Sequence, residues 1–215
     1  MFDLSKAGGI AALFMALAYA VTIYIFLIML DYPNITDAAQ RLDLLVNQTS
    51  LVLLTNLLSY VAFGVALVVL VVALHDRLRA SSPAMVAVAS ALGLIWAGSL
   101  VASGMVANAG IDPAVQLSAT DPVRAAQIWA QTEAVASGLG NGNGEVLGGL
   151  MTLLFSWAGF RAAGLPKVLG LWGALTGLVG LASVVPGLVD LTGVFGIAQL
   201  VWFAGLAFVL LRDRA

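Results

Sequence analysis

Long apolar stretches alternate with short polar, glycine-containing or proline-containing segments along the whole chain. Six of these stretches are close to the length of about 20 residues that a helix needs to cross a bilayer. They run over residues 8–30, 51–74, 83–106, 137–160, 168–185 and 195–211. Helices are expected because every backbone polar group must find a partner inside hydrocarbon. The pattern predicts an all-α, polytopic integral membrane protein with a single membrane domain, a six-transmembrane-helix bundle.

Basic residues divide unequally between the two sides that this placement defines. If both termini lie on one side, that side holds Lys6, Arg77, Arg79, Arg161, Lys167, Arg212 and Arg214. The opposite side holds only Arg41 and Arg124. Because cytoplasmic loops carry an excess of Lys and Arg, the N- and C-termini are predicted to be cytoplasmic. The long connections over 31–50 and 107–136 are then predicted to lie outside.

The two long connections contain helix-start signals of their own. Asp37 is predicted to cap a helix, with Gln40 at the capping-box position. Asp121 followed by Pro122 predicts a second start, because proline is favoured at the first helical position. The next residues, 123–136, mix apolar and polar side chains. They predict an amphipathic helix that lies either in the outer interface or over the bundle as a short cap.

Composition separates this chain from soluble and disordered proteins. Hydrophobic residues make up 61% of the 215 and charged residues 9%, whereas a soluble domain has about 45–50% and about 25%. Disorder requires low hydrophobicity and high charge, so it is excluded as well. The formal net charge of −2 offers no basic surface to nucleic acid. Membrane lipids are therefore the first partners that we expect.

The small number of reactive side chains excludes several chemistries. The chain has no cysteine, which excludes disulfides, thiolate-bound zinc, cysteine-ligated iron–sulfur clusters and cysteine catalysis. His75 is the only histidine, so a bis-histidine haem, a copper site and a histidine-based zinc enzyme are excluded too. The two lysines, Lys6 and Lys167, fall at the membrane edge, where neither can form a buried Schiff base. We expect no metal and no cofactor.

The fourth apolar stretch carries the polar residues that point most directly to a function. At 100° per residue, one helix face within about 60° holds Asn141, Glu145, Thr152 and Ser156. Glu145 is the only acid expected in or close to hydrocarbon, where ionisable residues are candidates for function. The glycines of this stretch permit close helix packing, or an unwound segment whose backbone groups meet a ligand.

Polar residues on other stretches extend this candidate site. Asn56 and Tyr60 lie on the second stretch and Gln199 lies on the sixth, mostly in the predicted outer half of the bilayer. One interpretation is a pocket that opens to the outside and is built around Glu145. The other is that these side chains hydrogen-bond to one another and hold the bundle together, at about 0.6 kcal/mol per contact. The sequence is compatible with both interpretations.

Several segments together resemble a known family. They are Lys6 before Gly9-Ile10, an acidic connection after the first stretch, Val72-Ala-Leu-His-Asp-Arg77, Gly164-Leu-Pro-Lys-Val-Leu-Gly170 and the closing Gln199–Arg212. Over nearly its whole length the chain resembles the bacterial six-span membrane proteins grouped as domain-of-unknown-function family 4386. The resemblance implies a multi-pass protein of the bacterial inner (plasma) membrane, and it assigns no catalytic residue.

Three function classes compete on these observations. The first is a non-enzymatic protein that binds a lipid, a small apolar ligand or a partner membrane subunit, or another copy of itself, in or beside the bundle. Small-residue faces such as Gly140-x3-Gly144-x3-Gly148 and Gly173-x3-Gly177 favour it. The second is a small-solute or ion transporter or channel with an outward-facing polar pocket around Glu145. An intramembrane enzyme is the least favoured, because one buried acid has no evident catalytic partner.

Overall fold

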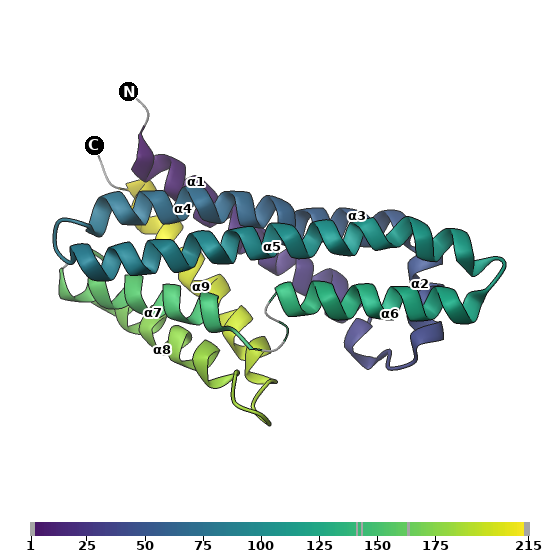
Figure 1. Cartoon of the computed structure of the whole chain (residues 1–215). Coiled ribbons are helices and arrows are strands. Elements are labelled where there is room, and N and C mark those ends of the chain that lie inside the picture. The colour runs from purple at the N-terminus through teal and green to yellow at the C-terminus, as the bar shows by residue number, and fades with distance from the viewer. Residues whose placement is uncertain (1–2, 141, 143, 163, 213–215) are drawn as a thin grey trace.

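The computed structural model describes residues 3–140, 142, 144–162 and 164–212. These residues are mostly helical and contain no strand (Figure 1). Two of the helical segments, η1 and η3, are π-helical, and η2 is a single 3-10 turn. In chain order the elements are α1 (Leu4–Ile23), η1 (Tyr24–Met29), η2 (Tyr32–Asn34), α2 (Ala38–Asn47), α3 (Thr49–Asn56), η3 (Leu57–Ala62), α4 (Phe63–Leu78), α5 (Pro83–Ser118), α6 (Pro122–Leu139), α7 (Val146–Arg161), α8 (Lys167–Ala182) and α9 (Leu191–Arg212).

Within these described ranges, four continuous helical segments are long and apolar enough to cross a membrane. They are Leu4–Met29, Thr49–Leu78, Pro83–Ser118 and Leu191–Arg212. Two further apolar helices, α7 and α8, have 16 residues each. Large apolar side chains face outward on these helices, and Ile10, Leu17 and Val168 are 63%, 58% and 82% exposed. Such a surface is compatible with an integral membrane protein, because it is unfavourable in water.

Both ends of the described chain lie at one end of the molecule, together with the α4–α5 and α7–α8 turns (Figure 1). Arg77 near the end of α4 donates from Nε to the carbonyl oxygen of Gly164, at 2.7 Å, and so joins the two turns. His75 accepts from or donates to Ser90 through Nδ1, at 2.8 Å, which ties α4 to the start of α5. The described basic residues that the sequence places on one side, which are all of that set except Arg214, therefore share one end of the fold. Their cytoplasmic location stays a prediction.

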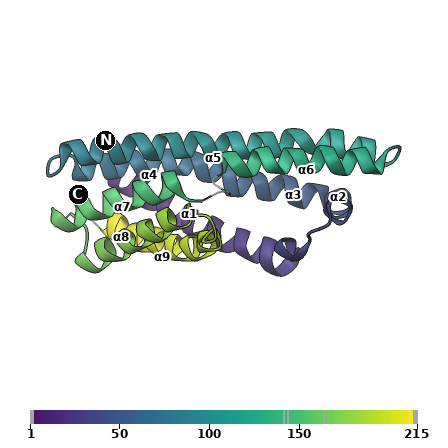
Figure 2. The ribbon, with the colours of Figure 1, turned by 60° about the horizontal axis from the view of Figure 1, so that its bottom comes forward.

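Two separate apolar cores hold the helices together. The bundle core joins α1, α4, α5, α7 and α9 through residues such as Leu67, Trp96, Phe155 and Phe203. The hairpin core joins α2, α3, the second half of α5 and α6, through Leu42, Leu45, Val52, Ile111, Ala114, Ala125, Ala126 and Trp129. Figure 2 shows α6 running beside the second half of α5. The longest helix, α5, therefore belongs to both cores.

The connection predicted over 107–136 is a helical hairpin in the structure. α5 continues through Pro113 to Ser118, although a proline inside a helix removes one backbone hydrogen bond. α6 begins at Pro122, and Asp121 accepts a hydrogen bond from the Arg124 amide at 3.1 Å, as its capping signal predicts. Asp37 likewise caps α2 by accepting from Ala39 N at 2.9 Å. α6 packs along α5 and α2, which favours the cap over the interfacial helix.

The helix predicted over 137–160 is interrupted, which corrects the picture of a continuous polar stripe. α6 ends at Leu139 and α7 begins at Val146. Gly144 has a φ of +119°, a conformation that glycine adopts far more readily than other residues. A Cβ atom at Gly144 would also lie 2.7 Å from Val184 Cα, so the backbones approach closely here. The glycines of this stretch therefore support an unwound connection.

Candidate functional site

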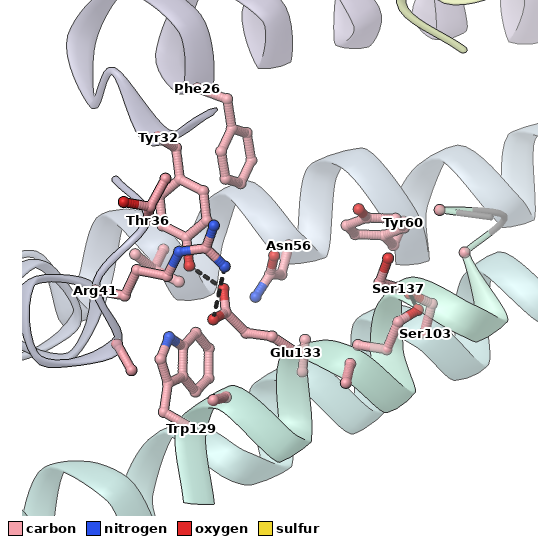
Figure 3. A pocket seen from close by; sticks show the side chains of 18 residues that line it. Phe26, Tyr32, Thr36, Arg41, Asn56, Tyr60, Ser103, Trp129, Glu133 and Ser137 are labelled. Atoms are coloured by element: carbon pink, nitrogen blue, oxygen red, sulfur yellow. Dashed lines mark hydrogen bonds and ion pairs between the residues drawn. The ribbon is translucent and has the colours of Figure 1, made fainter. Parts of the chain in front are cut away.

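Two adjoining cavities lie where the bundle core meets the hairpin core. The large cavity has a volume of about 540 Å³ and lies between η1, η2, α2, α3, η3, α5 and α6 (Figure 3). The small cavity has a volume of about 160 Å³ and lies between α1, η3, α4, α5 and Glu145. Tyr60 and Gly140 line both cavities. Ligand sites in proteins commonly have volumes of about 300–1,000 Å³, so the large cavity alone has the size of a binding site.

A charged cluster forms one wall of the large cavity (Figure 3). Tyr32 donates its hydroxyl proton to Glu133 Oε1, and Arg41 Nη1 lies 3.5 Å from Glu133 Oε2. The Arg41 guanidinium also stands 5.1 Å from the centre of the Tyr32 ring, and its Nε donates to Ile35 O at 2.7 Å. Burial and the hydrogen bond to Glu133 raise the pKa of the Tyr32 hydroxyl. Tyr32 therefore stays protonated near neutral pH and remains a donor.

Amide and hydroxyl groups form the wall nearer the bundle. Asn56 donates from Nδ2 to Asn108 Oδ1 at 3.0 Å, which joins α3 to α5. Ser103 donates to Ala136 O at 2.7 Å, and so satisfies a carbonyl group in the last turn of α6. Figure 3 shows Tyr60 beside Ser137 and Ser103, away from the cluster around Arg41. Because Tyr60 also lines the small cavity, its ring stands at the junction of the two spaces.

Glu145 lines the small cavity from the start of α7. Its backbone N–H donates to Ser183 Oγ at 3.0 Å, which anchors the unwound connection to the end of α8. Its Oε2 atom is buried and has no hydrogen-bond partner among the described residues, and the same holds for Trp96 Nε1. A Cβ atom on Gly148 would lie within 3.0 Å of both side chains. Buried polar atoms normally have a hydrogen-bond partner. Glu145 Oε2 and Trp96 Nε1 are therefore candidates to bond to a ligand group in or near the small cavity.

Thr152 and Gln199 lie away from both cavities and pair with each other. Gln199 Nε2 donates to Thr152 Oγ1 at 2.9 Å, and both residues are fully buried between α7 and α9. Neither residue lines the large or the small cavity. This geometry matches the interpretation of such groups as contacts that hold the bundle together. Asn141, the remaining predicted site residue, lies outside the described residues.

The structure thus groups some of the predicted residues and adds others. Asn56, Tyr60 and Glu145 come together along the two cavities. The cluster of Tyr32, Arg41 and Glu133 was not foreseen, although Arg41 and Glu133 are opposite charges on two connections that the sequence places on the same side. In the described part of the chain, no group of three or more His, Cys, Asp or Glu side chains could hold a metal ion.

Comparison with known proteins gave no relative: the chain matches no family model, no curated protein and no solved structure. Membership of domain-of-unknown-function family 4386 therefore stays a prediction. The two cavities and the side chains that line them are the features of this chain that indicate a function.

Proposed function

We propose that this chain is a non-enzymatic, multi-pass protein of the bacterial inner membrane that binds a small lipid-like or apolar molecule in its two adjoining cavities. The observation that carries the proposal is that the large and the small cavity lie next to each other, because Tyr60 and Gly140 line both. The walls combine aromatic rings with a few fixed polar groups, a combination that is typical of small-molecule sites. The unpartnered Glu145 and Trp96 atoms add an acceptor and a donor for that molecule.

The proposal includes six membrane crossings with both termini in the cytoplasm. The four long apolar segments supply four crossings, and α7 and α8 supply two shorter ones. At about 1.5 Å per residue, 16 residues span about 24 Å, so each short helix needs help from its flanking residues to cross about 30 Å of hydrocarbon. α2 and α6, which line the large cavity, lie at the end opposite the termini (Figure 1), so in this proposal the cavity faces the outside.

Single cysteines in this cysteine-free chain test the orientation. We expect a membrane-impermeant maleimide to label Thr120→Cys in intact cells and to leave Arg79→Cys unlabelled, because both positions are exposed but lie at opposite ends of the fold. Both cysteines should react after the cells are permeabilised. Labelling of position 79 alone in intact cells would reverse the proposed topology.

Native mass spectrometry tests the binding proposal. We expect the purified protein to retain a small molecule of defined mass, and Ala134→Phe to lose it, because Ala134 lines the large cavity. Val135→Phe is the matched control, since its side chain is 56% exposed and does not line the large cavity. Equal retention by both variants, or an empty wild-type protein, would contradict the proposal.

A second candidate function, transport of a small solute or ion, is favoured by the irregular backbone around the cavities. The π-helical η1 and η3 contribute Phe26 and Tyr60 to the lining, and Gly140 and Glu145, on either side of the helix interruption, line the small cavity. Interrupted helices at such sites are a feature of transporters. If the chain is a transporter, the cysteine of a Ser59→Cys variant should react with a membrane-impermeant maleimide added to either side of the membrane. If it is a binding protein, this cysteine should react only with reagent added from the outside.

A further inference from the structure

The small cavity has an unusual chemical character for a buried space. Four aromatic side chains line it, those of Tyr19, Tyr60, Phe63 and Trp96. Glu145 supplies the only carboxyl group among its lining residues, and no Lys, Arg or His lines it. Arg41 lines the large cavity and not the small one, and it is engaged with Glu133 at 3.5 Å. The cavity therefore presents aromatic rings and one carboxyl group.

This composition favours one class of ligand over others. A carboxylate that is removed from water requires a positive partner, and a cation is attracted to the faces of Trp, Tyr and Phe rings. A bare divalent metal ion needs six or more oxygen ligands. The Thr22 and Ser59 hydroxyls already bond to each other at 2.6 Å, which leaves at most the Glu145 carboxyl and the two tyrosine hydroxyls of the lining, fewer than six side-chain oxygens. An organic ammonium group needs only one counter-ion and the aromatic faces.

The size of the small cavity agrees with such a group. A volume of about 160 Å³ is close to that of an engineered cavity of about 150 Å³ that holds benzene. A methylated ammonium group is of comparable size. The remainder of a larger ligand would pass Tyr60 and Gly140 into the large cavity, whose volume is more than three times greater.

We propose that the small cavity binds the ammonium head group of an amphipathic or small organic cation, with Glu145 as the counter-ion and the aromatic side chains as the walls. This inference rests on the proposed binding function and specifies the class of ligand. The same head group could belong to a free solute or to a membrane lipid. The test therefore includes one probe of each kind.

The probes are choline, lysophosphatidylcholine and 3,3-dimethylbutan-1-ol, the last being the uncharged carbon analogue of choline. We expect the wild-type protein in nanodiscs to bind choline or lysophosphatidylcholine at least about tenfold more tightly than the uncharged alcohol, by calorimetry. Binding of choline indicates a free cation as a sufficient ligand. Binding of the lysolipid alone indicates a lipid head group. Either result supports the proposal.

Two variants tie this preference to the small cavity. Glu145→Gln removes the charge and should abolish the preference for the cation while affinity for the alcohol is retained. Tyr60→Leu keeps the charge and removes a ring, and should lower cation affinity by about three- to tenfold. Asp112→Asn is the matched control, because it also removes one carboxylate but lies at an exposed position that lines neither cavity. Circular dichroism and the melting temperature establish that each variant is folded.

Failure of this inference is distinguishable from failure of the proposed function. If the alcohol binds as tightly as choline, or if Glu145→Gln leaves the preference unchanged, the ammonium site is wrong and a binding cavity remains. If no probe binds but a molecule of other mass is retained in native mass spectrometry, the ammonium site is again wrong. If no probe and no retained molecule are found, both proposals fail.

Discussion

The bundle core and the hairpin core are stabilised in different ways. In the bundle, small residues let helices approach until their backbones touch: a Cβ atom on Gly149 would lie 3.0 Å from Gly177 O. In the hairpin, polar contacts of the kind found in soluble proteins recur, such as the cap at Asp121 and the ion pair between Arg41 and Glu133. The chain thus combines close backbone packing in the bundle with helix-cap and ion-pair contacts in the hairpin. Substitutions of the two kinds should therefore separate the two regions.

The largest effect is expected from overfilling the α7–α8 contact. Gly177→Ala places a Cβ atom 2.6 Å from Gly149 O and 2.7 Å from Leu153 N, both of which are backbone atoms that cannot move aside. We expect a loss of about 1–3 kcal/mol in the free energy of unfolding, measured by denaturant titration in detergent. Gly98→Ala on α5 is the matched control, because nothing lies within 4 Å of its Cβ position. Equal stability of the two variants would contradict close packing at α7–α8.

The next effect concerns Tyr32 and should be confined to the hairpin. Tyr32→Phe removes the hydrogen bond to Glu133, and we expect a loss of about 1.5 kcal/mol, because the acceptor is a carboxylate. Hydrogen exchange should rise around α2 and α6 and remain unchanged in α7 and α8. Faster exchange throughout the chain would show instead that the two regions unfold as one.

The pH dependence of the same variant has a definite sign. The folded-state pKa of Tyr32 is raised above the value of about 10 that is expected for the unfolded chain. Its contribution to stability is therefore fully present below about pH 10 and is lost as pH rises through the folded pKa. The stability difference between wild type and Tyr32→Phe should shrink above pH 10, while the other tyrosines titrate equally in both proteins. A difference that is constant between pH 8 and 11 would contradict the buried, hydrogen-bonded hydroxyl.

A smaller effect is expected at the start of α6. Asp121→Ala removes the acceptor for the Arg124 amide and should cost about 1 kcal/mol of helix stability. Asp121→Asn is the control, since asparagine caps helices about as well as aspartate. The measurement is the hydrogen exchange of the first turn of α6, which only the alanine variant should accelerate. Equal acceleration by both variants would point to loss of charge rather than loss of the cap.

The fold could be predicted where hydrophobicity alone determines it, and less well where it does not. The apolar stretches locate the long helices, and the Asp37 and Asp121 signals locate two helix starts that the structure confirms. Hydropathy could not show that α5 continues through Pro113, because that part of the helix is held by its packing against α6. The interruption before Val146 depends on the positive φ of Gly144, which composition permits but does not require.

The candidate site was predictable only in part for a related reason. The cost of burying an ionisable side chain pointed to Glu145, and in the structure Glu145 lines a cavity together with Tyr60. Helical periodicity put Thr152 on the same face, but the interrupted helix separates it from Glu145, and it pairs with Gln199 instead. Trp96 reaches the small cavity from α5. Helical periodicity relates only residues of one segment, so it could not predict that Trp96 and Glu145 line the same cavity.

The smallest effect tests whether the Thr152–Gln199 pair acts only as a bundle contact. A double-mutant cycle with Thr152→Val and Gln199→Leu should give a coupling of about 0.6 kcal/mol, which is the average for such pairs between membrane helices. Ser156→Ala is the control on the same helix, because Ser156 Oγ has no hydrogen-bond partner among the described residues and its removal should cost less than Thr152→Val. Ligand retention in native mass spectrometry should persist in every variant, since Thr152 and Gln199 line neither cavity. A coupling near zero together with loss of the retained molecule would contradict this assignment. It would show that Thr152 and Gln199 belong to the binding site, and that packing and binding residues are not separate in the bundle.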